Sequence, residues 1–545
     1  MFKLFSRKLI VRSSVLTIIL LSAIFFSPHS AEAAARTASV SGNWNSTATW
    51  GGASVPVEGD TVTINAGITV TVTANAACSS IVFTTGTTGT TASITINSGV
   101  LLAVSGNVTI TRPGTNNFND ITVGAGTLTI GGTLALSGTT AGSRYTTLNI
   151  STGTVTVTGN ITSAGAASRI IFSGNGVLNA GGTFMSGTAG TFTASTGTVN
   201  YNNAGDQTIG AYTYYNLTTS GSGTKTTSAA TTIGGNLIVN SGTVFATGAT
   251  NTWTLTVTGT TNVSGTLTLN NTGNKTFTGD VTINSSGVWN ETGIAAIGFG
   301  GSLINNANTF TANSGTHTFS GASKNLSGAT TTTIPGTATF TGSYTNSGTF
   351  SASTLSTIGG TVANNGIVTI STALSGNGGF TQGVTGVLNY AGSTIGITTF
   401  SANTSGNTVN YNGATQTIRS TTYHHLTLSG AGTQTAAGAI IINGNLNNST
   451  NFDLAANTLS VNGSITNTSG TLRFSGATNG IAASSGTVEY YGAAQTVGVG
   501  IYNNLTLSGS GAKTLTNTTI NGILSIEGTA TTAGTTPIYG GAATL

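Results

Sequence analysis

Charge is what this 545-residue sequence lacks most: Asp, Glu, Lys and Arg together make up only 4 % of it, against about 25 % in an ordinary soluble domain. A helix-rich protein is excluded, because it would need Glu, Lys and Arg in quantity. Proline (5 residues), methionine (2) and cysteine (1) are also scarce. The lack of charge does not indicate disorder, because 37 % of the residues are hydrophobic and Val and Ile recur in phase.

Threonine and glycine are the abundant residues instead, with 114 Thr and 80 Gly. Glycine has no three-residue period, which excludes a collagen-like chain. Segments 69–73, 154–158 and 254–258 alternate Thr with Val or Leu, which is the period of a half-buried strand. Gly, Asn and Ser between such segments suit turns. The composition therefore predicts an all-β protein.

Residues 1–33 are typical of a cleaved secretory signal peptide. Basic residues precede an apolar run from Val15 to Phe26, and small residues follow at Ala31–Ala35. Cleavage after Ala33 fits the A-x-A rule, and cleavage after Ala35 is the alternative. A retained membrane anchor is the other interpretation, but the run is shorter than the roughly 20 residues that span a bilayer. We expect a secreted or cell-surface protein with no membrane span after cleavage of the signal.

Much of the net charge of +4 comes from this leader. Four of the 14 basic residues and one of the 10 acidic residues lie in residues 1–33, which leaves 10 basic and 9 acidic residues and a net charge of +1. The remaining basic residues are scattered, and we expect no nucleic-acid partner, since binding phosphates needs a clustered basic face. Cys78 is the only cysteine, so no internal disulfide forms, and its neighbours predict a small buried residue rather than a reactive thiol.

Glycine followed by a small residue and an aliphatic residue recurs along the chain. The members of the pairs Gly126/Gly132 and Gly153/Gly159 are six positions apart, and the second pair repeats the first twenty-seven positions later. The short step fits a strand with a tight corner, and the long step fits one coil of a solenoid. With roughly 20–27 residues per coil, the residues after Ala33 would make about 20–25 coils. We predict an elongated parallel β-helix or β-solenoid; a tandem array of β-sandwich domains is the alternative.

A longer unit occurs three times, near residues 197–226, 407–435 and 486–514. In each copy a Gln precedes a Tyr by seven positions, that Tyr precedes a Leu by three, and a further Tyr lies before the Gln. We favour a structural interpretation, in which the first Tyr of each copy packs at a strand edge and the Gln binds turn carbonyls. The alternative is a sugar-stacking aromatic side chain beside an amide. The repeat positions are Tyr201, Gln207, Tyr214, Leu217, Tyr411, Gln416, Tyr423, Leu426, Tyr490, Gln495, Tyr502 and Leu505.

The N-terminal stretch 34–100 differs from the rest. It holds two of the four Trp, Trp44 and Trp50, together with Pro56 and Asp60. A solenoid needs its first coil covered, because an open edge recruits other chains. We predict that residues 34–100 form a cap and the first coils, and that residues 101–545 form the solenoid repeats. Asp60 is expected to cap the adjacent turn rather than to perform chemistry.

Two patterns carry a resemblance to known proteins. The pattern W-x5-W followed by P-x-x-G-D-x-V-x-I, from Trp44 to Ile64, resembles the opening of G8-type modules and of large secreted bacterial β-strand-repeat proteins. The pattern Y-N-G-A-x-Q-T at 411–417, with the Y-x-x-L-T-L-S-G that follows, resembles the repeats of those bacterial proteins. The resemblance implies an exported, adhesin-like parallel β-helix with a G8-like cap. The last residues, 539–545, read like the start of another repeat and predict a fragment of a longer surface protein.

Chemically reactive groups are sparse after the leader. Of the nine acidic residues only Glu58 and Asp60 are close in sequence, and His424 and His425 occupy a position that Tyr-Asn or Asn-Asn fills in the sister copies. No Walker A, H-E-x-x-H or calcium-loop motif occurs. We therefore predict no catalytic, cofactor-binding or metal-binding residues. Stacked coils can bring distant acids together, so a carbohydrate-active β-helix enzyme of the lyase or hydrolase type is the alternative, and two carboxylates within about 10 Å in a groove would favour it.

The predicted function is structural or adhesive and non-catalytic, without a cofactor. A rigid solenoid would display polar loops toward extracellular polysaccharide, matrix or a host surface, with self-association as a second kind of contact. A minor alternative is an ice-binding solenoid, which requires Thr-x-Thr pairs in register on many successive coils. In the sequence these pairs are scattered and interrupted by Asn, Ser and Gly.

Overall fold

The computed structural model describes residues 33–86, 90–114, 116–139, 144–248, 252–477 and 481–544. Strands make up 53 % of the chain and helix 1 %, so that the prediction of an all-β protein is confirmed. Within the described residues the only helical element is a short 3-10 turn, Thr47–Trp50. The predicted signal peptide, apart from Ala33, lies outside these residues and stays a prediction.

Strands pair in parallel from one coil to the next, and the chain forms a parallel β-solenoid of about 23 turns, as predicted. For example, β11 (Thr127–Ile130) pairs with β14 (Thr154–Val157), with Thr127 opposite Thr154. This is the same step along the chain as from Gly126 to Gly153, as expected. The alternative of tandem β-sandwich domains is wrong, because sandwiches are built from antiparallel sheets. The chain divides into two units: unit 1 comprises residues 1–170 and 187–191, and unit 2 comprises residues 171–186 and 192–545.

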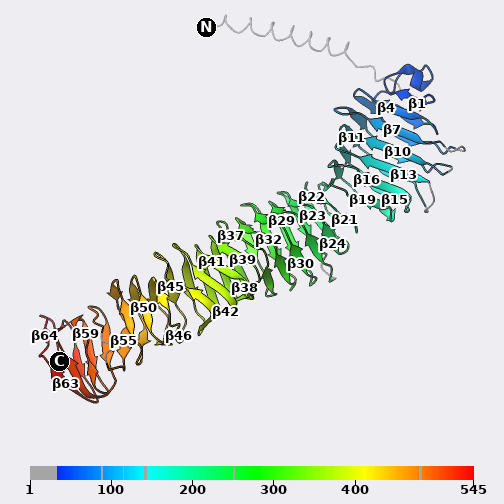
Figure 1. Ribbon diagram of the computed structural model, residues 1–545. Coiled ribbons are helices and arrows are strands. Elements are labelled where there is room, and N and C mark those ends of the chain that lie inside the picture. Colours follow the sequence, from blue (N-terminus) through cyan, green and yellow to red (C-terminus); the bar gives the residue numbers. More distant parts are fainter. Residues whose placement is uncertain are drawn as a thin grey trace, which may run out of the picture. The chain divides into compact units, whose positions relative to one another are not determined.

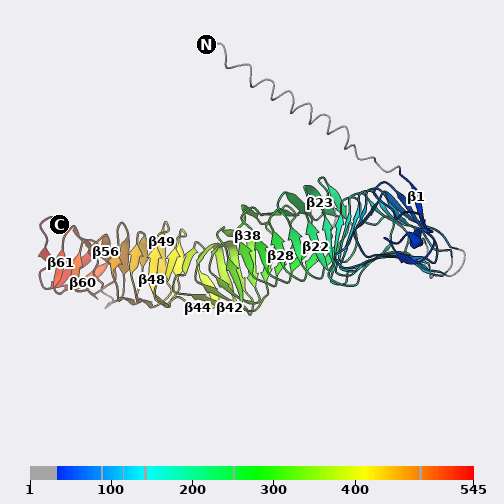
Figure 2. The same cartoon turned by 90° about the horizontal axis from the view of Figure 1, so that it is seen from above.

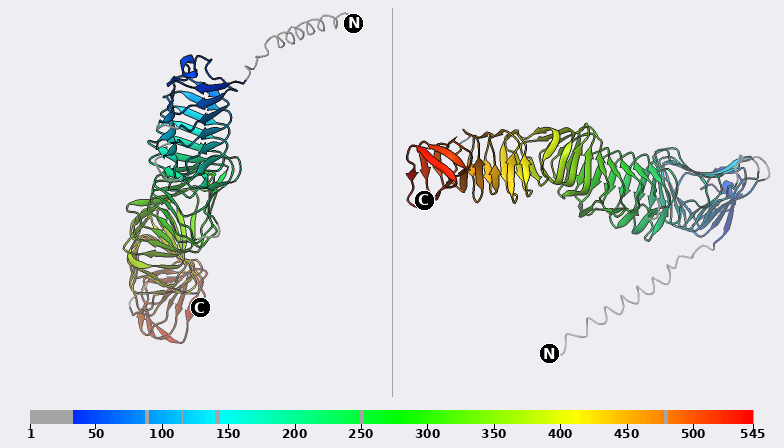
Figure 3. Two further views of the ribbon diagram at one scale, coloured as in Figure 1. Left: turned by 90° about the vertical axis from the view of Figure 1, so that its right-hand side faces the viewer. Right: turned by 90° about the horizontal axis from the view of Figure 1, so that it is seen from below.

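Unit 1 is built from three parallel rows of strands, which Figures 1 and 3 show one coil after the next. Figure 2 views this unit nearly along the stack, so that its coils overlap. One row contains β1 (Ala35–Ala38), β3 (Thr61–Ile64), β6 (Ser80–Phe83), β9 (Val108–Ile110), β12 (Leu134–Leu136) and β15 (Ile161–Ala164). The second contains β2 (Gly42–Asn43), β4 (Thr69–Val72), β7 (Ala92–Ile96), β10 (Phe118–Val123) and β13 (Tyr145–Ile150), and the third β5 (Ala76–Cys78), β8 (Leu101–Val104), β11 and β14.

Three rows also make up the first part of unit 2. One row runs through β24 (Thr231–Ile233), β27 (Leu255–Val257), β30 (Lys275–Phe277), β33 (Ile297–Phe299), β36 (His317–Phe319), β38 (Thr332–Phe340) and β40 (Thr349–Thr357). Another runs through β25 (Leu237–Val239), β28 (Thr261–Val263), β31 (Val281–Ile283), β34 (Leu303–Asn305), β37 (Lys324–Ser327) and β39 (Ser343–Asn346). The third contains β21 (Gln207–Ile209), β23 (Gly223–Thr227), β26 (Thr243–Ala246), β29 (Thr266–Leu269), β32 (Val288–Glu291) and β35 (Thr309–Thr311).

Later coils of unit 2 continue this winding with shorter turns. The strands used below are β42 (Ile367–Gln382), β43 (Val387–Tyr390), β45 (Thr408–Tyr411), β48 (His425–Leu428), β51 (Leu446–Asn448), β52 (Asn451–Asp453), β54 (Ile465–Thr466), β55 (Thr471–Phe474), β56 (Thr487–Tyr490) and β59 (Asn504–Leu507). Leu472 pairs with Val488, which is a shorter step along the chain than the predicted coil length. The turns between strands are therefore tighter here than the N-terminal spacings indicated.

The core lies inside the coils, where alternate strand residues point. In β14 Val155 and Val157 are fully buried, while Thr154 and Thr156, which alternate with them, face outward. In unit 2 the rings of Phe277, Phe299, Phe319 and Phe340 stack from coil to coil, with successive centroids 6.0, 5.2 and 4.7 Å apart. Each such side chain contributes about 1.5–3 kcal/mol by leaving water, and the stack keeps the neighbouring coils in register.

Cys78 is a free, buried thiol, and its burial raises its pKa to about 12, so that it is not a reactive thiolate. In the described part of the chain we find no helix with the length and apolarity that a membrane crossing requires.

Candidate functional site

Each of the three repeated units closes a ring of hydrogen bonds. In the second copy the N–H of Arg419 donates to the Tyr411 hydroxyl at 3.3 Å, and the Tyr411 and Tyr423 hydroxyls lie 3.0 Å apart. The Tyr423 hydroxyl donates to the carbonyl of Arg419 at 2.8 Å. Because Tyr423 uses its proton there, Tyr411 must donate to Tyr423. The ring therefore starts and ends on the backbone of one residue.

The first and third copies repeat this ring around Gly210 and Gly498. Their hydroxyl pairs are 2.7 and 3.1 Å apart. Burial raises the pKa of all six Tyr hydroxyls, that of Tyr411 to about 12, so that they remain donors at neutral pH. The six Tyr side chains lie inside the coils and not at an exposed strand edge. Because they are buried, none of their rings is accessible for a sugar to stack on. They are Tyr201, Tyr214, Tyr411, Tyr423, Tyr490 and Tyr502.

The repeated Gln holds the neighbouring turn. Gln416 Nε2 donates to the carbonyls of Tyr390 and Gly392 at 2.9 and 2.7 Å, and its Oε1 accepts from Gly413 N–H at 2.8 Å. Gln207 and Gln495 make the corresponding three hydrogen bonds in their own copies. The side chains of the repeated Leu residues, Leu217, Leu426 and Leu505, are fully buried in the core. All twelve repeat positions thus act within the coil.

Our sequence analysis missed a fourth polar position of the unit, filled by Lys225, Gln434 and Lys513. Lys513 stacks directly on Gln495 in the parallel register, as Lys225 does on Gln207. Lys513 Nζ donates to the carbonyls of Gly492 and Ala493 and to Gln495 Oε1, at 2.6–2.8 Å. Burial lowers the pKa of both Lys side chains. The signal was present, because this position follows the repeated Leu at the same spacing in every copy.

The N-terminal Trp residues pack against each other. Trp50 Nε1 donates to the carbonyl of Trp44 at 2.7 Å, and the two rings meet edge-on with centroids 5.2 Å apart. Both side chains are 3 % exposed, and Pro56 is buried nearby in sequence. The arrangement is a compact aromatic cluster beside β2, while its role as a cap stays a prediction.

Asp60 joins the first strand to the turn that precedes β3. Its carboxylate accepts from the N–H groups of Ala34 and Val57 at 2.8 and 3.2 Å and from Arg36 Nε at 3.0 Å. Burial alone would raise the pKa of Asp60, but these hydrogen bonds and the Arg36 charge outweigh it, and the pKa is lowered. With 1 % of its surface exposed, this carboxylate is bonded within the fold and is not presented to solvent.

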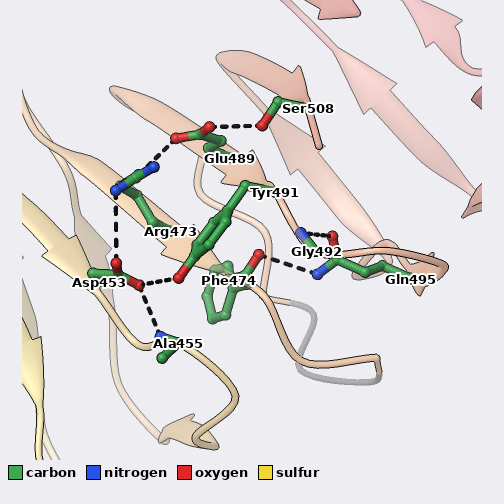
Figure 4. A network of polar contacts seen from close by, with 9 residues as sticks. All are labelled: Asp453, Ala455, Arg473, Phe474, Glu489, Tyr491, Gly492, Gln495 and Ser508. Carbon is green, nitrogen blue, oxygen red and sulfur yellow. Dashed lines mark hydrogen bonds and ion pairs between the residues drawn. The ribbon is translucent and has the colours of Figure 1, made fainter. Parts of the chain in front are cut away.

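A cluster in unit 2 joins two carboxylates through one guanidinium (Figure 4). Asp453, Arg473 and Glu489 lie side by side on β52, β55 and β56. Arg473 Nε is 2.7 Å from Glu489 Oε2, and its Nη1 is 3.6 Å from Asp453 Oδ2. Ser508 donates to Glu489 at 2.7 Å and Tyr491 donates to Asp453 at 2.9 Å. The cluster brings two carboxylates from separate coils to one guanidinium, whereas the enzyme alternative called for a pair of carboxylates in a groove.

The chemistry of this cluster does not suit acid catalysis. Burial would raise the pKa of Glu489, but the hydrogen bonds from Arg473 and Ser508 outweigh it and lower the pKa. A general acid in glycoside hydrolysis needs the opposite shift. Asp453 also accepts from the N–H of Ala455 at 2.8 Å, so that both carboxylates are already occupied by donors.

A second ionisable cluster is sealed inside unit 2. Glu291 accepts from Trp289 Nε1 at 2.6 Å and from Asn313 N–H at 2.9 Å, and lies 3.0 Å from His317 Nε2. The side chains of His317 and Glu291 are both 0 % exposed. A substrate could not reach them without opening the coil. Sequence reasoning did not find this pair, because the two residues are 26 positions apart and carry no motif.

The His pair lies at the start of β48, where the sister copies carry Tyr-Asn or Asn-Asn. His425 Nδ1 accepts from Asn445 N–H at 3.0 Å. Asn216 and Asn504 accept from the corresponding N–H groups of the next coil at 2.9 Å each. In the described residues no group of three or more His, Cys, Asp or Glu could hold a metal ion.

Comparisons with known proteins give no relative for this chain. No family model matches it, and neither curated proteins nor solved structures give a match. The β-solenoid is therefore shown by the structure alone, and the resemblance to G8-type modules and adhesin-like proteins stays a prediction.

Proposed function

We propose that the chain is an exported, non-catalytic solenoid that attaches to extracellular polysaccharide or matrix through a column of outward polar side chains. This polar column is the observation that carries the proposal. Eight residues from eight consecutive coils stand opposite one another in the parallel register, and all are exposed or half-exposed. They are Thr333, Ser351, Thr369, Asn389, Asn410, Thr427, Asn447 and Thr466.

The polar column offers donors and acceptors at a fixed repeat. Successive coils are about 4.8 Å apart, and Asn389 and Asn410 bond along the column, with Asn410 Nδ2 3.3 Å from Asn389 Oδ1. A flexible surface would lose conformational entropy on binding, whereas these side chains already stand on a rigid stack. Single hydrogen bonds to a sugar hydroxyl are weak in water. Many of them on one rigid support give useful avidity to a repeating polymer.

A polysaccharide-active enzyme is the second candidate, favoured only by the Asp453–Arg473–Glu489 cluster. We place it behind attachment because the shared guanidinium lowers the pKa of Glu489 and occupies both acids. An assay for reducing ends or unsaturated sugars on extracellular polysaccharides decides between the two. Depolymerisation that is lost in Glu489→Gln would establish the enzyme and refute the non-catalytic proposal.

Binding to insoluble polysaccharides tests the attachment proposal directly. The chain from residue 34 is incubated with cellulose, chitin, peptidoglycan and bacterial exopolysaccharide, and the bound fraction is measured after sedimentation. We expect binding to at least one polymer, lost when Asn389, Asn410 and Thr427 are all replaced by Ala. The matched control replaces Asn290 and Thr311, outward residues of β32 and β35, and should bind like the unaltered chain.

Salt dependence provides a second readout. The polar column carries no formal charge, so binding should change little as NaCl is raised. Binding to none of the polymers, equal loss in both sets of variants, or a steep fall with salt would each contradict the proposal. Export itself is tested by locating the chain on intact cells with an antibody against residues 197–226.

A further inference from the structure

Lys275, the first residue of β30, is a fully buried amine to which the attachment proposal gives no role. Its Nζ donates to Asn271 Oδ1 at 2.6 Å, to the carbonyl of Trp253 at 3.3 Å and to the carbonyl of Gly273. Because a C=O bond is about 1.2 Å long, Nζ lies within about 3.8 Å of Asn271 Cγ. A nitrogen that can act as a nucleophile thus faces a side-chain amide inside the coil.

Hydrogen bonds hold the Asn271 amide in one orientation. Its Nδ2 donates to the carbonyls of Thr247 and Gly248 at 2.9 and 3.0 Å. Its Oδ1 accepts from the Gly273 N–H at 3.1 Å as well as from Lys275. These donors polarise the C=O bond, and the Gly273 N–H stabilises the negative charge that an attack on Cγ places on the oxygen. The amide carbon is therefore a better electrophile here than in a free side chain.

The surroundings of Lys275 favour the uncharged amine, which is the nucleophilic form. Burial lowers the pKa of Lys275 to about 8, although the charge of Glu291 opposes part of this shift. Glu291 lies on the next coil, opposite Leu269 in the parallel register, and its side chain is closed to solvent. As Nζ becomes positive during an attack, this carboxylate stabilises the new charge more strongly than it would in water.

Enclosure in the coil excludes an external substrate but does not hinder this pair. Asn271 and Lys275 lie four positions apart, on the turn between β29 and β30, and their groups are already in contact. Holding two reacting groups together replaces a bimolecular encounter and gives a large effective concentration. A second buried pair, Lys513 Nζ and Gln495 Oε1, is 2.8 Å apart, but burial lowers the pKa of Lys513 with no carboxylate acting on it in the described residues. We expect that pair to stay uncoupled.

We propose that Lys275 and Asn271 condense into an intramolecular amide cross-link. Lys275 Nζ bonds to Asn271 Cγ and the Cγ–Nδ2 bond breaks, while Nδ2 takes up two protons from the Lys ammonium. The products are a secondary amide and one ammonium ion, so that atoms and charge balance without an oxidant, a reductant or a co-reactant. The cross-link closes the turn between β29 and β30, and a pulling force cannot then extend residues 271–275. The inference is independent of polysaccharide attachment, because it involves only side chains inside the coil.

Mass spectrometry of the chain from residue 34, purified in the folded state and then denatured, tests the proposal. We expect an intact mass that is lower than the sequence mass by one molecule of ammonia. Trypsin requires a free Lys side chain, so the bond after Lys275 should resist cleavage, and fragmentation should find Asn271 and Lys275 joined in one peptide. Cleavage after Lys513 should proceed normally and provides a control within the same digest.

Two variants assign the missing ammonia. Lys275→His removes the amine and introduces the residue that His317 already provides in the same column two coils further on; this variant should have its full sequence mass. The matched control Lys513→Gln alters another buried Lys and should remain one ammonia molecule short. The unaltered chain decides the question even if a variant misfolds. A full sequence mass, cleavage after Lys275 despite the missing ammonia (the result for a cyclic imide at Asn271), or the same deficit in Lys275→His would each overturn the proposal.

Discussion

Tyr411, Tyr423 and the backbone of Arg419 form a closed ring of hydrogen bonds, and removing one hydroxyl breaks it in a predictable way. In Tyr411→Phe the N–H of Arg419 loses its acceptor. In Tyr423→Phe the carbonyl of Arg419 loses its donor, and the Tyr411 hydroxyl loses its acceptor. In the double variant only the N–H and the carbonyl of Arg419 are left unsatisfied.

The magnitudes follow from counting unsatisfied groups. Each buried group without a partner costs about 1–3 kcal/mol, so Tyr411→Phe should cost about 1–3 kcal/mol and Tyr423→Phe, which leaves two such groups, about 2–6 kcal/mol. The double variant also leaves two groups and should cost about the same 2–6 kcal/mol. The two changes are then far from additive, with a coupling energy of about 1–3 kcal/mol between them.

Native-state hydrogen exchange is the suitable assay, because a solenoid opens coil by coil and has no single two-state transition. The amides of β45, β48 and Arg419 report the opening free energy of this coil. Tyr215→Phe serves as the control: its side chain is 38 % exposed, and the change should stay within about 0.5 kcal/mol. A double variant whose cost equals the sum of the two single costs would refute the closed ring.

Three further outcomes are expected. Lys513→Gln should be tolerated, since Gln434 fills this position in the second copy. Lys513→Met should destabilise its coil by about 2–4 kcal/mol, because it leaves oxygen acceptors unpaired. Equal hydrogen-exchange rates in the two variants would argue against a stabilising role of the Lys513 hydrogen bonds. Asp60, whose pKa is lowered from 3.8, stabilises the fold above that pH and loses this effect as the pH falls through its folded pKa. The local opening free energy measured by hydrogen exchange around Asp60 should therefore depend less on acid in Asp60→Asn than in the unaltered chain, and parallel acid profiles would contradict this. His425→Asn should leave the opening free energy of its coil unchanged, because Asn504 accepts from the equivalent backbone N–H in the third copy. His425→Ala should lower it by about 0.5–1.5 kcal/mol, and similar values for both variants would show that the acceptor is unimportant.

The fold could be predicted because it depends on local patterns that are visible in the sequence. Alternation in segments such as 154–158 fixes which residues face inward, and the spacing between Gly126 and Gly153 fixes the coil. Both are properties of neighbouring residues and one repeat length, so they can be read without knowing the contacts. The fixed spacings in the three longer units likewise identify the Tyr and Gln positions that build the rings and turns.

Side-chain contacts between coils could not be predicted from the sequence in the same way. Asp453, Arg473 and Glu489 meet only because the turns between their strands, one of them shortened, bring them level, and Glu291 meets His317 across a whole coil. The length of each turn varies from coil to coil, and an error of one residue would reverse the face on which a side chain lies.

Layered pairing also has a consequence for how such a chain changes in evolution. Each coil is bonded only to the layer before it and the layer after it, so that duplicating a complete turn inserts a new layer without disturbing the rest. Three copies of one unit, with the same internal spacings, are the trace such duplications leave. Unequal recombination can thus lengthen or shorten the solenoid by whole coils, while the side chains on the remaining coils are inherited unchanged.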